Sequence, residues 1–201
     1  TSPADVLFVY DPRCFYYLGY QFFNGRPAGK TDTVGFEAIN RTLADACHSG
    51  IAFDTVLLED LPLLDLRPYK AVVYAFTPYM TDEDRAYARE RVAREGRTVV
   101  WVYAPGYTDG RTLDLERMNE VTGMRLTQCP ITLPPEWGIP EGRLGARSPE
   151  VRYVPFVLHS PTTPLFQVDD PDAATIALYT GTSYVAVASK KLADSTAWFC
   201  G

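Results

Sequence analysis

The chain has 201 residues and the composition of an ordinary folded protein, with 46% hydrophobic, 13% aromatic and 22% charged residues. This length suits one large domain, and no segment combines low hydrophobicity with high charge as disordered tails do. The net charge of −6 disfavours nucleic acid as a partner, since phosphate binding needs clustered Lys and Arg, and no apolar run approaches the roughly 20 residues of a membrane-spanning helix.

The first part of the chain alternates between apolar runs and a helical pattern. VLFVY, Val6–Tyr10, is rich in strand formers and is bounded by prolines, which predicts a strand buried on both faces. Apolar residues at three- and four-residue spacing predict a helix over 34–48, ended by Gly50. FDTVLL, at 53–58, is the second predicted strand, and a loop with room for one helical turn follows it.

The next segment reads as a complete βαβ unit. Ala71–Phe76 is its first predicted strand, Thr81 is a well-placed N-cap before three acidic residues, and the helix should run to about Arg94. Residues 98–103 form the fourth predicted strand. The basic residues between 85 and 97 are interleaved with glutamates, which is typical of a solvated helix face.

The second half of the chain changes character. A short helix is predicted over 115–121, closed by Gly123. Residues 127–150 are rich in proline and glycine and predict a loop without regular elements. The remaining residues read as short strands in hairpins attached to the parallel core, at 153–158, 165–168, 175–179, 184–189 and 196–200.

Together these patterns predict an α/β fold of the flavodoxin-like or Rossmann-like kind. Three layers are expected, with helices on both faces of a parallel sheet and a C-terminal β-hairpin extension. Residues 1–126 form the predicted core, 127–150 a Pro/Gly-rich loop, and 151–201 a β extension of the same domain. The opening TSPADVLFVY lacks signal-peptide features and enters a strand at once, as expected for a piece of a longer chain, and it indicates no compartment.

Ligands of open α/β sheets bind outside the carboxyl ends of the strands, and polar residues gather there in this sequence. Their carboxylates and tyrosines suit a sugar or cation site, whereas ordinary turn chemistry explains the aspartates equally well. Both interpretations stay open for this predicted rim, which consists of Asp11, Arg13, Tyr79, Tyr107 and Asp109.

An aromatic loop follows the first strand. It is either a contact surface for another domain or an aromatic-rich part of the core, because large apolar residues are mostly buried. Its members are Phe15, Tyr16, Tyr17, Tyr20 and Phe22.

The sequence gives little support for catalysis. In several α/β enzyme families the turn after the fourth strand carries a nucleophile, but here Ala104, Pro105 and Gly106 occupy it. The four cysteines show neither metal-site nor redox spacing, so no metal, cofactor or catalytic residue is predicted. A hydrolase that uses Cys14 or His159 is the remaining catalytic alternative.

The segments RPYKAVVYAFTPYMTDEDRAYARERVAREGRTVVWVYAPGY and LERMNEVTGMRL resemble the class I glutamine-amidotransferase-like domain of large bacterial glycoside hydrolases, and the trimerisation domain of family-42 β-galactosidases in particular. The resemblance covers residues 5–126 and extends more loosely to YVAVASKK and STAWFCG. Amidotransferases carry G-x-C-x-G at the turn; with Gly106 on the second glycine, Ala104 takes the place of the cysteine and Val102 that of the first glycine. The resemblance therefore implies a domain without the nucleophile.

In such proteins the hydrolytic carboxylates lie on a separate barrel domain. The resemblance thus implies a non-catalytic accessory domain of a larger glycoside hydrolase, which packs on the catalytic domain of the parent chain and either mediates self-association or helps to wall the active-site cleft. The alternative is a carbohydrate- or small-ligand-binding module that uses the rim. Neither interpretation calls for nucleic acid or a membrane.

Overall fold

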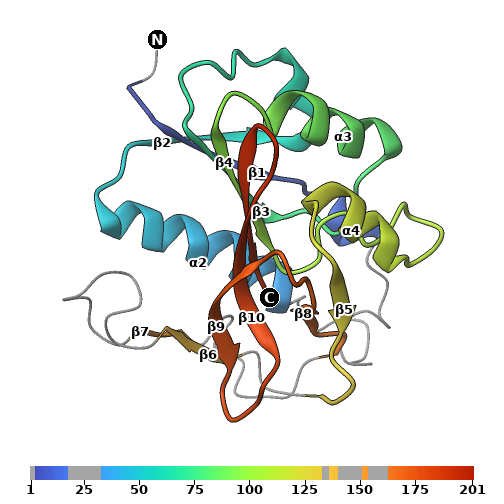
Figure 1. Cartoon of the computed structure of the whole chain (residues 1–201). Coiled ribbons are helices and arrows are strands. Elements are labelled where there is room, and N and C mark those ends of the chain that lie inside the picture. Colours follow the sequence, from blue (N-terminus) through green and yellow to red (C-terminus); the bar gives the residue numbers. More distant parts are fainter. Residues whose placement is uncertain (1–2, 18–32, 133–135, 140–150, 154–162) are drawn as a thin grey trace.

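The computed structural model describes residues 3–17, 33–132, 136–139, 151–153 and 163–201. They form a nine-stranded mixed sheet in the order β2-β1-β3-β4-β11-β10-β9-β6-β7, beside a two-stranded sheet β5-β8 (Figure 1). The strands are β1 Val6–Tyr10, β2 Phe53–Leu57, β3 Ala71–Phe76, β4 Arg97–Val102, β5 Leu126–Gln128, β6 Trp137–Ile139, β7 Val151–Tyr153, β8 Phe166–Val168, β9 Ala174–Tyr179, β10 Val185–Lys191 and β11 Ser195–Cys200.

The predicted α/β fold is confirmed. Strands β2, β1, β3, β4 and β11 run parallel, and β1 pairs with β2 on one side and β3 on the other. This is the flavodoxin-like strand order: β2 lies on one side of β1, and the chain then crosses over to place β3 on the other side. The helical elements are α1 Cys14–Tyr17, α2 Thr33–Ser49, the 3₁₀ helix η1 Leu58–Leu63, α3 Asp82–Tyr87, the π-helix η2 Ala88–Val92 and α4 Leu115–Thr122.

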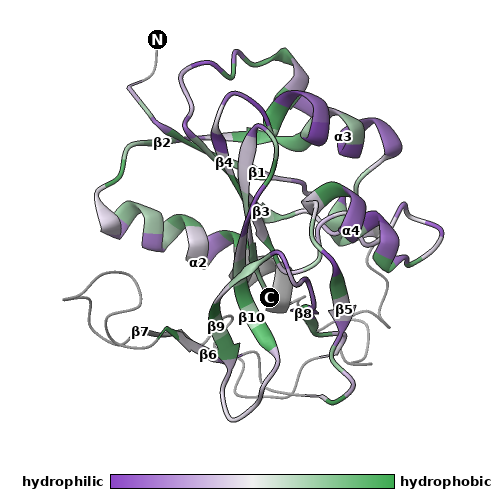
Figure 2. Cartoon of the chain, viewed as in Figure 1, coloured by the Kyte–Doolittle hydropathy of each residue, from purple (hydrophilic) through white to green (hydrophobic). Residues whose placement is uncertain are grey.

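Helices cover both faces of the parallel strands. Alternate strand residues point to opposite faces, so each strand contributes apolar side chains to the helices on both sides. Leu7 and Val9 of β1 join a large buried cluster that includes Met118 of α4. Phe8, between them, packs instead in a second cluster with Ala46 of α2. Figure 1 shows α2 on one side of the strands and α3 and α4 on the other, and Figure 2 shows the largely hydrophilic outer turns of α3 and α4.

The cap signals in the sequence act as predicted. Thr81 accepts the amide N–H of Asp84 at 3.1 Å, and Asp84 accepts the amide N–H of Thr81 at 3.0 Å, so the two residues form a capping box at the start of α3. Gly123 ends α4 with a φ of 69°, a left-handed conformation that glycine adopts without strain. The helix after Thr81 continues from α3 into η2, a π-helical turn that the apolar spacing did not predict.

The prediction that the basic residues from 85 to 97 form a solvated face is wrong at two positions. Arg85 and Arg97 are 5% and 4% exposed. The guanidinium of Arg97 donates to the carbonyl oxygens of Tyr69 and Val92, and that of Arg85 donates to the carbonyl oxygen of Met80. These backbone acceptors, which a charge pattern does not reveal, compensate for the burial together with ion pairs from Arg97 to Glu95 and from Arg85 to Asp82.

The C-terminal strands form the predicted antiparallel extension, through β10 paired with β9 and β11. The final strand does more than close a hairpin, because β11 also pairs in parallel with β4 over all six residues. The loop prediction for 127–150 needs correction: β5 extends into it as far as Gln128, and β6 is a strand within it. Trp137–Ile139 is short enough to fit between the prolines of the sequence at 135 and 140.

Smaller differences concern ends and thiols. The strand expected at 153–158 is described only as β7, Val151–Tyr153; residues 154–158 lie outside the described part of the chain. The second strand ends at Leu57, and η1 begins at the next residue. All four cysteines are free thiols, and Cys47 is exposed.

Candidate functional site

The best-defined cluster of predicted rim residues lies at the switch point between β1 and β3. Asp11 follows β1 directly and is only 2% exposed. Its carboxylate accepts the backbone N–H of Arg13 at 2.9 Å, and the guanidinium Nε and Nη2 of Arg13 both lie 2.8 Å from its Oδ2. The two residues therefore form a bidentate, charge-assisted pair, the strongest kind of side-chain hydrogen bonding.

Arg13 links this pair to the neighbouring loop and helix. Its guanidinium carbon lies 5.3 Å from the ring centroid of Tyr79, and its Nη2 lies 3.4 Å from Oδ2 of Asp84, the capping residue of α3. The hydrogen bond to Asp11 raises the pKa of Arg13 above its usual value, although burial opposes this. The side chain of Arg13 is still 29% exposed, so it is the charged group of this cluster that solvent or a ligand can reach most readily.

The loops after β3 and β4 are tied together by their backbones. Gly106 donates to the carbonyl of Thr77 at 2.9 Å, and Tyr79 forms an isolated parallel bridge with Thr108. Thr77 is fully buried, and no described residue is a hydrogen-bond partner for its hydroxyl. Backbone contacts therefore join the loops at the carboxyl ends of β3 and β4, next to a buried polar atom.

The other two rim residues make contacts of their own. Tyr107 packs edge-on against Phe166 at 5.0 Å between ring centroids, and burial raises the pKa of Tyr107. Asp109 accepts the amide N–H groups of Thr112 and Arg111, which lower its pKa to about 2, and its Oδ2 lies 2.8 Å from Nη2 of Arg117. The structure thus brings Asp11, Arg13 and Tyr79 into contact, whereas Tyr107 and Asp109 are engaged with other partners.

The turn after β4 has a strained backbone, and Ala104, Pro105 and Gly106 give it no nucleophilic side chain. Its non-glycine residue with positive φ is Tyr103, at 67°, one position before Ala104. The hydroxyl of Tyr103 donates to the carbonyl oxygen of Pro164 at 2.7 Å, and both Tyr103 and Ala104 are buried. In a nucleophile elbow a helix follows the strained residue at once, but the next helix here begins only at Leu115.

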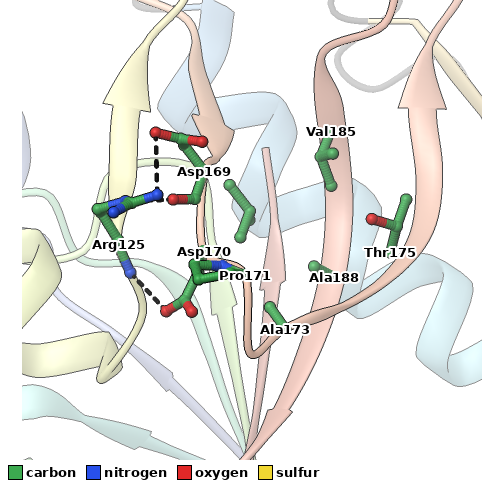
Figure 3. Close-up of a pocket in the computed structure, with 9 residues that line it drawn as sticks. Arg125, Asp169, Asp170, Pro171, Ala173, Thr175, Val185 and Ala188 are labelled. Atoms are coloured by element: carbon green, nitrogen blue, oxygen red, sulfur yellow. Dashed lines mark hydrogen bonds and ion pairs between the residues drawn. The ribbon is translucent and has the colours of Figure 1, made fainter.

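A pocket lies between the two sheets (Figure 3). This pocket of about 240 Å³ is bordered by Arg125, Asp169 and Asp170 on one side and by small and aliphatic residues, such as Ala188, on the other. Its charges compensate each other: Nη2 of Arg125 lies 3.4 Å from Oδ2 of Asp169, and Nζ of Lys190 lies 2.8 Å from Oδ2 of Asp170. The Lys190–Asp170 pair joins β10 of the main sheet to the small sheet, whereas the ion pair of Arg125 with Asp169 and the amide N–H of Arg125 donating to Asp170 at 2.9 Å link the ends of β5 and β8; together they account for the polar lining.

The aromatic loop is described only in its first part. Phe15 and Tyr16 of α1 are 42% and 85% exposed, which favours the contact-surface interpretation for these two residues. Of Tyr17 only the backbone is described, and Tyr20, Phe22 and His159 lie outside the described residues. Cys14 is fully buried behind the exposed aromatics, within 3.8 Å of the carbonyl oxygen of Phe76.

Among the residues that the structure describes, no three or more His, Cys, Asp or Glu side chains gather as they would around a metal ion. None of the described helices is long and apolar enough to cross a membrane.

Solved structures share the fold. A β-galactosidase from the Antarctic haloarchaeon Halorubrum lacusprofundi superposes with a TM-score of 0.58 at 18% identity; the match covers 98% of this chain and 27% of the β-galactosidase. A ThuA-like protein from Bacteroides uniformis matches with a TM-score of 0.50 at 12% identity, over 90% of this chain and 69% of that one. The chain therefore spans about a quarter of the length of the β-galactosidase. No family model and no curated protein matches the sequence.

Proposed function

We propose that this chain is an accessory domain of a larger glycoside hydrolase, of the amidotransferase-like, trimerisation type. The observation that supports this most is the match of nearly the whole chain to about a quarter of a β-galactosidase. A domain of that kind assembles the enzyme or walls its active-site cleft, while catalysis takes place elsewhere. The non-catalytic role also agrees with the turn after β4, where buried Ala104 occupies the position of a nucleophile.

In this proposal residues 1–201 act as one unit. The predicted core at 1–126 and the predicted extension at 151–201 share a sheet, since β11 pairs with β4. The catalytic domain of the parent chain is the first partner, and the exposed aromatic side chains of α1 are the surface that meets it. Phe15 and Tyr16 suit this role because aromatic residues dominate the buried centres of protein interfaces.

The first test is the natural reading frame on both sides of residues 1–201. A region with the alternating strand and helix pattern of a (β/α)₈ barrel, with carboxylates at its strand ends, is expected there. A frame that encodes no other domain overturns the proposal.

The second test uses the enzyme that this frame encodes. The double substitution Phe15→Ser and Tyr16→Ser should lower its glycosidase activity or its assembly by tenfold or more while the domain remains folded. Leu178→Ser is the matched control, because Leu178 is 40% exposed but lies on β9, away from α1. Equal activity and assembly of both variants rules out the contact surface on α1.

The second candidate function is a carbohydrate- or small-ligand-binding module. The guanidinium of Arg13, which is partly exposed and lies beside Tyr79, supports this function, as does the buried hydroxyl of Thr77 nearby in the chain. Calorimetric titration of the 201-residue chain with galactosides and plant-polysaccharide fragments tests it. Heat that disappears in Arg13→Met supports this function, and the absence of heat with every sugar rejects it.

A further inference from the structure

The pocket between the two sheets has a charged wall and an apolar wall (Figure 3). Arg125 comes directly before β5, and Asp169 and Asp170 come directly after β8, so the charged wall belongs to the small sheet. Val185 and Ala188 on the opposite side belong to β10 of the main sheet. The volume of about 240 Å³ lies below the roughly 300–1,000 Å³ of pockets that hold drug-sized ligands, so a molecule the size of an amino acid suits it.

The two acidic residues of the charged wall differ in how firmly they are held. The carboxylate of Asp170 is 5% exposed and lies 2.8 Å from Nζ of Lys190. It also accepts the amide N–H groups of Arg125 and Asp172. The side chain of Asp169, in contrast, is 59% exposed, and its Oδ2 lies 3.4 Å from Nη2 of Arg125, longer than the roughly 2.7–2.9 Å of a charge-assisted hydrogen bond. Asp170 is therefore part of the frame of the pocket, whereas Asp169 is able to turn toward a ligand.

Arg125 is anchored by its backbone and by the inner part of its side chain. Its amide N–H donates to Asp170 at 2.9 Å, and its Nε donates to the carbonyl oxygen of Asp169. The side chain is still 58% exposed, so solvent or a ligand can reach its guanidinium. A guanidinium presents a planar pair of donors that matches a carboxylate. The pocket therefore holds a cation that suits a ligand carboxylate beside a carboxylate that suits a ligand ammonium.

The lining argues against three other kinds of ligand. None of the nine described residues that line the pocket is aromatic, so a sugar ring finds no aromatic face to stack on. The described part of the chain contains no group of three or more His, Cys, Asp or Glu side chains of the kind that holds a metal ion. A simple anion meets two carboxylates beside the guanidinium of Arg125, and like charges repel it. A small molecule that carries both an ammonium and a carboxylate meets none of these objections.

We propose that this pocket binds a small α-amino acid with an aliphatic side chain, its carboxylate on Arg125 and its ammonium on Asp169. The aliphatic side chain lies on the apolar part of the lining, which consists of Val168, Ala173, Val185 and Ala188. Because the walls come from both sheets, the bound ligand holds the small sheet against the main sheet. The inference goes beyond the proposed function, since it needs neither a catalytic domain nor a carbohydrate.

The first experiment is equilibrium dialysis of the 201-residue chain against radiolabelled L-valine. One saturable site per chain is expected, with a dissociation constant below about 1 mM. Unlabelled 3-methylbutanoate is valine without its ammonium, and 2-methylpropylamine is valine without its carboxylate. Each should displace the label at least about tenfold less well than valine does, because each leaves one charge of the pocket unmatched.

The second experiment removes one charge of the pocket at a time. Asp169→Asn and Arg125→Met should each weaken the binding of valine by about tenfold or more, through the loss of one charged hydrogen-bond partner. Both side chains are more than half exposed, so the variants should retain native circular dichroism. The matched controls are Asp65→Asn and Arg67→Met, because this ion pair is also exposed but does not line the pocket. They should bind valine like the wild type.

A third measurement reads out the pocket without a label. A ligand that binds only the folded chain raises its resistance to denaturation. Valine at about ten times its dissociation constant should therefore move the midpoint of urea unfolding of the wild type to higher urea. The same concentration should leave the midpoint of Asp169→Asn nearly unchanged.

Three outcomes overturn the proposal. One is a wild type that shows no saturable binding of valine with a dissociation constant below about 1 mM. Another is displacement of the label by 3-methylbutanoate or 2-methylpropylamine as readily as by valine. The third is unchanged binding in both Asp169→Asn and Arg125→Met. None of these outcomes bears on whether the reading frame encodes a catalytic barrel, so the two proposals can fail separately.

Discussion

Arg97 holds the end of the π-helical turn through Val92: its Nη1 lies 2.8 Å from the carbonyl oxygen of Val92. Further bonds to the carbonyl oxygens of Tyr69 and Arg94 place one buried guanidinium at the junction of η2, β4 and the segment before β3. This explains how a helix with a π turn can end so close to the start of β4. The carbonyl oxygens left over at a helix end need a donor, and Arg97 supplies it.

Replacing this guanidinium should be costly. Arg97→Met keeps most of the side-chain length but leaves several buried carbonyl oxygens without a donor, so we expect a loss of roughly 2–4 kcal/mol in the free energy of unfolding. Urea denaturation followed by circular dichroism measures it. The control is Arg67→Met, whose side chain is 83% exposed and should change stability by less than about 0.5 kcal/mol. Equal effects of the two substitutions contradict the structural role of Arg97.

The Asp11–Arg13 pair should show strong coupling. Arg13→Met leaves a carboxylate that is 2% exposed without its partner, and we expect a loss of about 2–3 kcal/mol. The double variant Asp11→Asn, Arg13→Met should recover part of this loss, and a double-mutant cycle by urea denaturation gives the coupling energy. The exposed pair Asp65–Arg67 has the same spacing and serves as the control, with coupling near zero. A coupling below about 0.5 kcal/mol at Asp11–Arg13 would contradict the expected importance of burial.

One thiol should react far faster than the other three. Cys47 is exposed, whereas burial raises the pKa of Cys129 to about 11 and that of Cys200 to about 12. Both of these thiols therefore stay protonated at pH 8, and Cys14 is inaccessible. Titration with a chromogenic disulfide at pH 8 should give one fast equivalent, which Cys47→Ser removes, and four equivalents in urea. A fast equivalent that survives Cys47→Ser points to a reactive thiol at Cys14 instead.

A cysteine at the turn after β4 should remain inert. Ala104 is fully buried, so Ala104→Cys places its thiol away from solvent and without a neighbouring helix N-terminus to lower its pKa. In the Cys47→Ser background this variant should add no fast-reacting thiol and should show no glutaminase activity. Rapid alkylation of the new cysteine would mean that the turn retains an accessible nucleophile position.

The Asp170–Lys190 pair should contribute to acid sensitivity. Burial opposes ionisation of Asp170, but the ammonium of Lys190 and the amide N–H groups of Arg125 and Asp172 outweigh it, and the pKa of Asp170 is lowered. A lowered pKa contributes stability above the unfolded-state pKa of about 3.9, and this stability is lost as the pH falls through the folded-state value. Asp170→Asn should therefore be less stable than the wild type at pH 7 and should lose less stability between pH 5 and 3. Parallel pH profiles from urea denaturation would exclude this contribution.

The local parts of the fold could be predicted from the sequence. Val6–Tyr10 and Ala71–Phe76 are apolar runs bounded by turn residues, and the structure places strands at the same residues. The capping box at Thr81 and the left-handed end at Gly123 also follow from neighbouring residues alone. Such features depend on short-range chemistry, which the sequence displays directly.

Long-range features were beyond the sequence patterns. Nothing in the run Ser195–Cys200 distinguishes a hairpin strand from one that also pairs with β4, because its partner lies about a hundred residues away. The burial of Arg85 and Arg97 depends on carbonyl groups whose positions only the folded backbone defines.

The sequence carries a local signal for part of the candidate site. The spacing Asp-x-Arg occurs at Asp11–Arg13, Asp65–Arg67 and Asp109–Arg111. At the first two the Arg amide N–H and Nε both donate to the Asp carboxylate, whereas at the third Arg111 donates its amide N–H and the ion pair of Asp109 is with Arg117. The spacing therefore predicts the local turn but not the ion pair. It does not predict which pair is buried, and burial is what makes the first one part of the candidate site.

The pairing of β11 with β4 also bears on how the protein folds. Bringing such distant strands together costs loop-closure entropy before their hydrogen bonds and side-chain contacts can form. Folding therefore slows as the mean sequence separation of contacts rises. The four parallel strands β2, β1, β3 and β4 are complete by Val102, but the apolar side chains on the β11 flank of β4 must wait for Phe199 and its neighbours. During synthesis this flank is the part of the sheet that stays open longest, and it is where chaperone binding or misassembly with another nascent chain would begin.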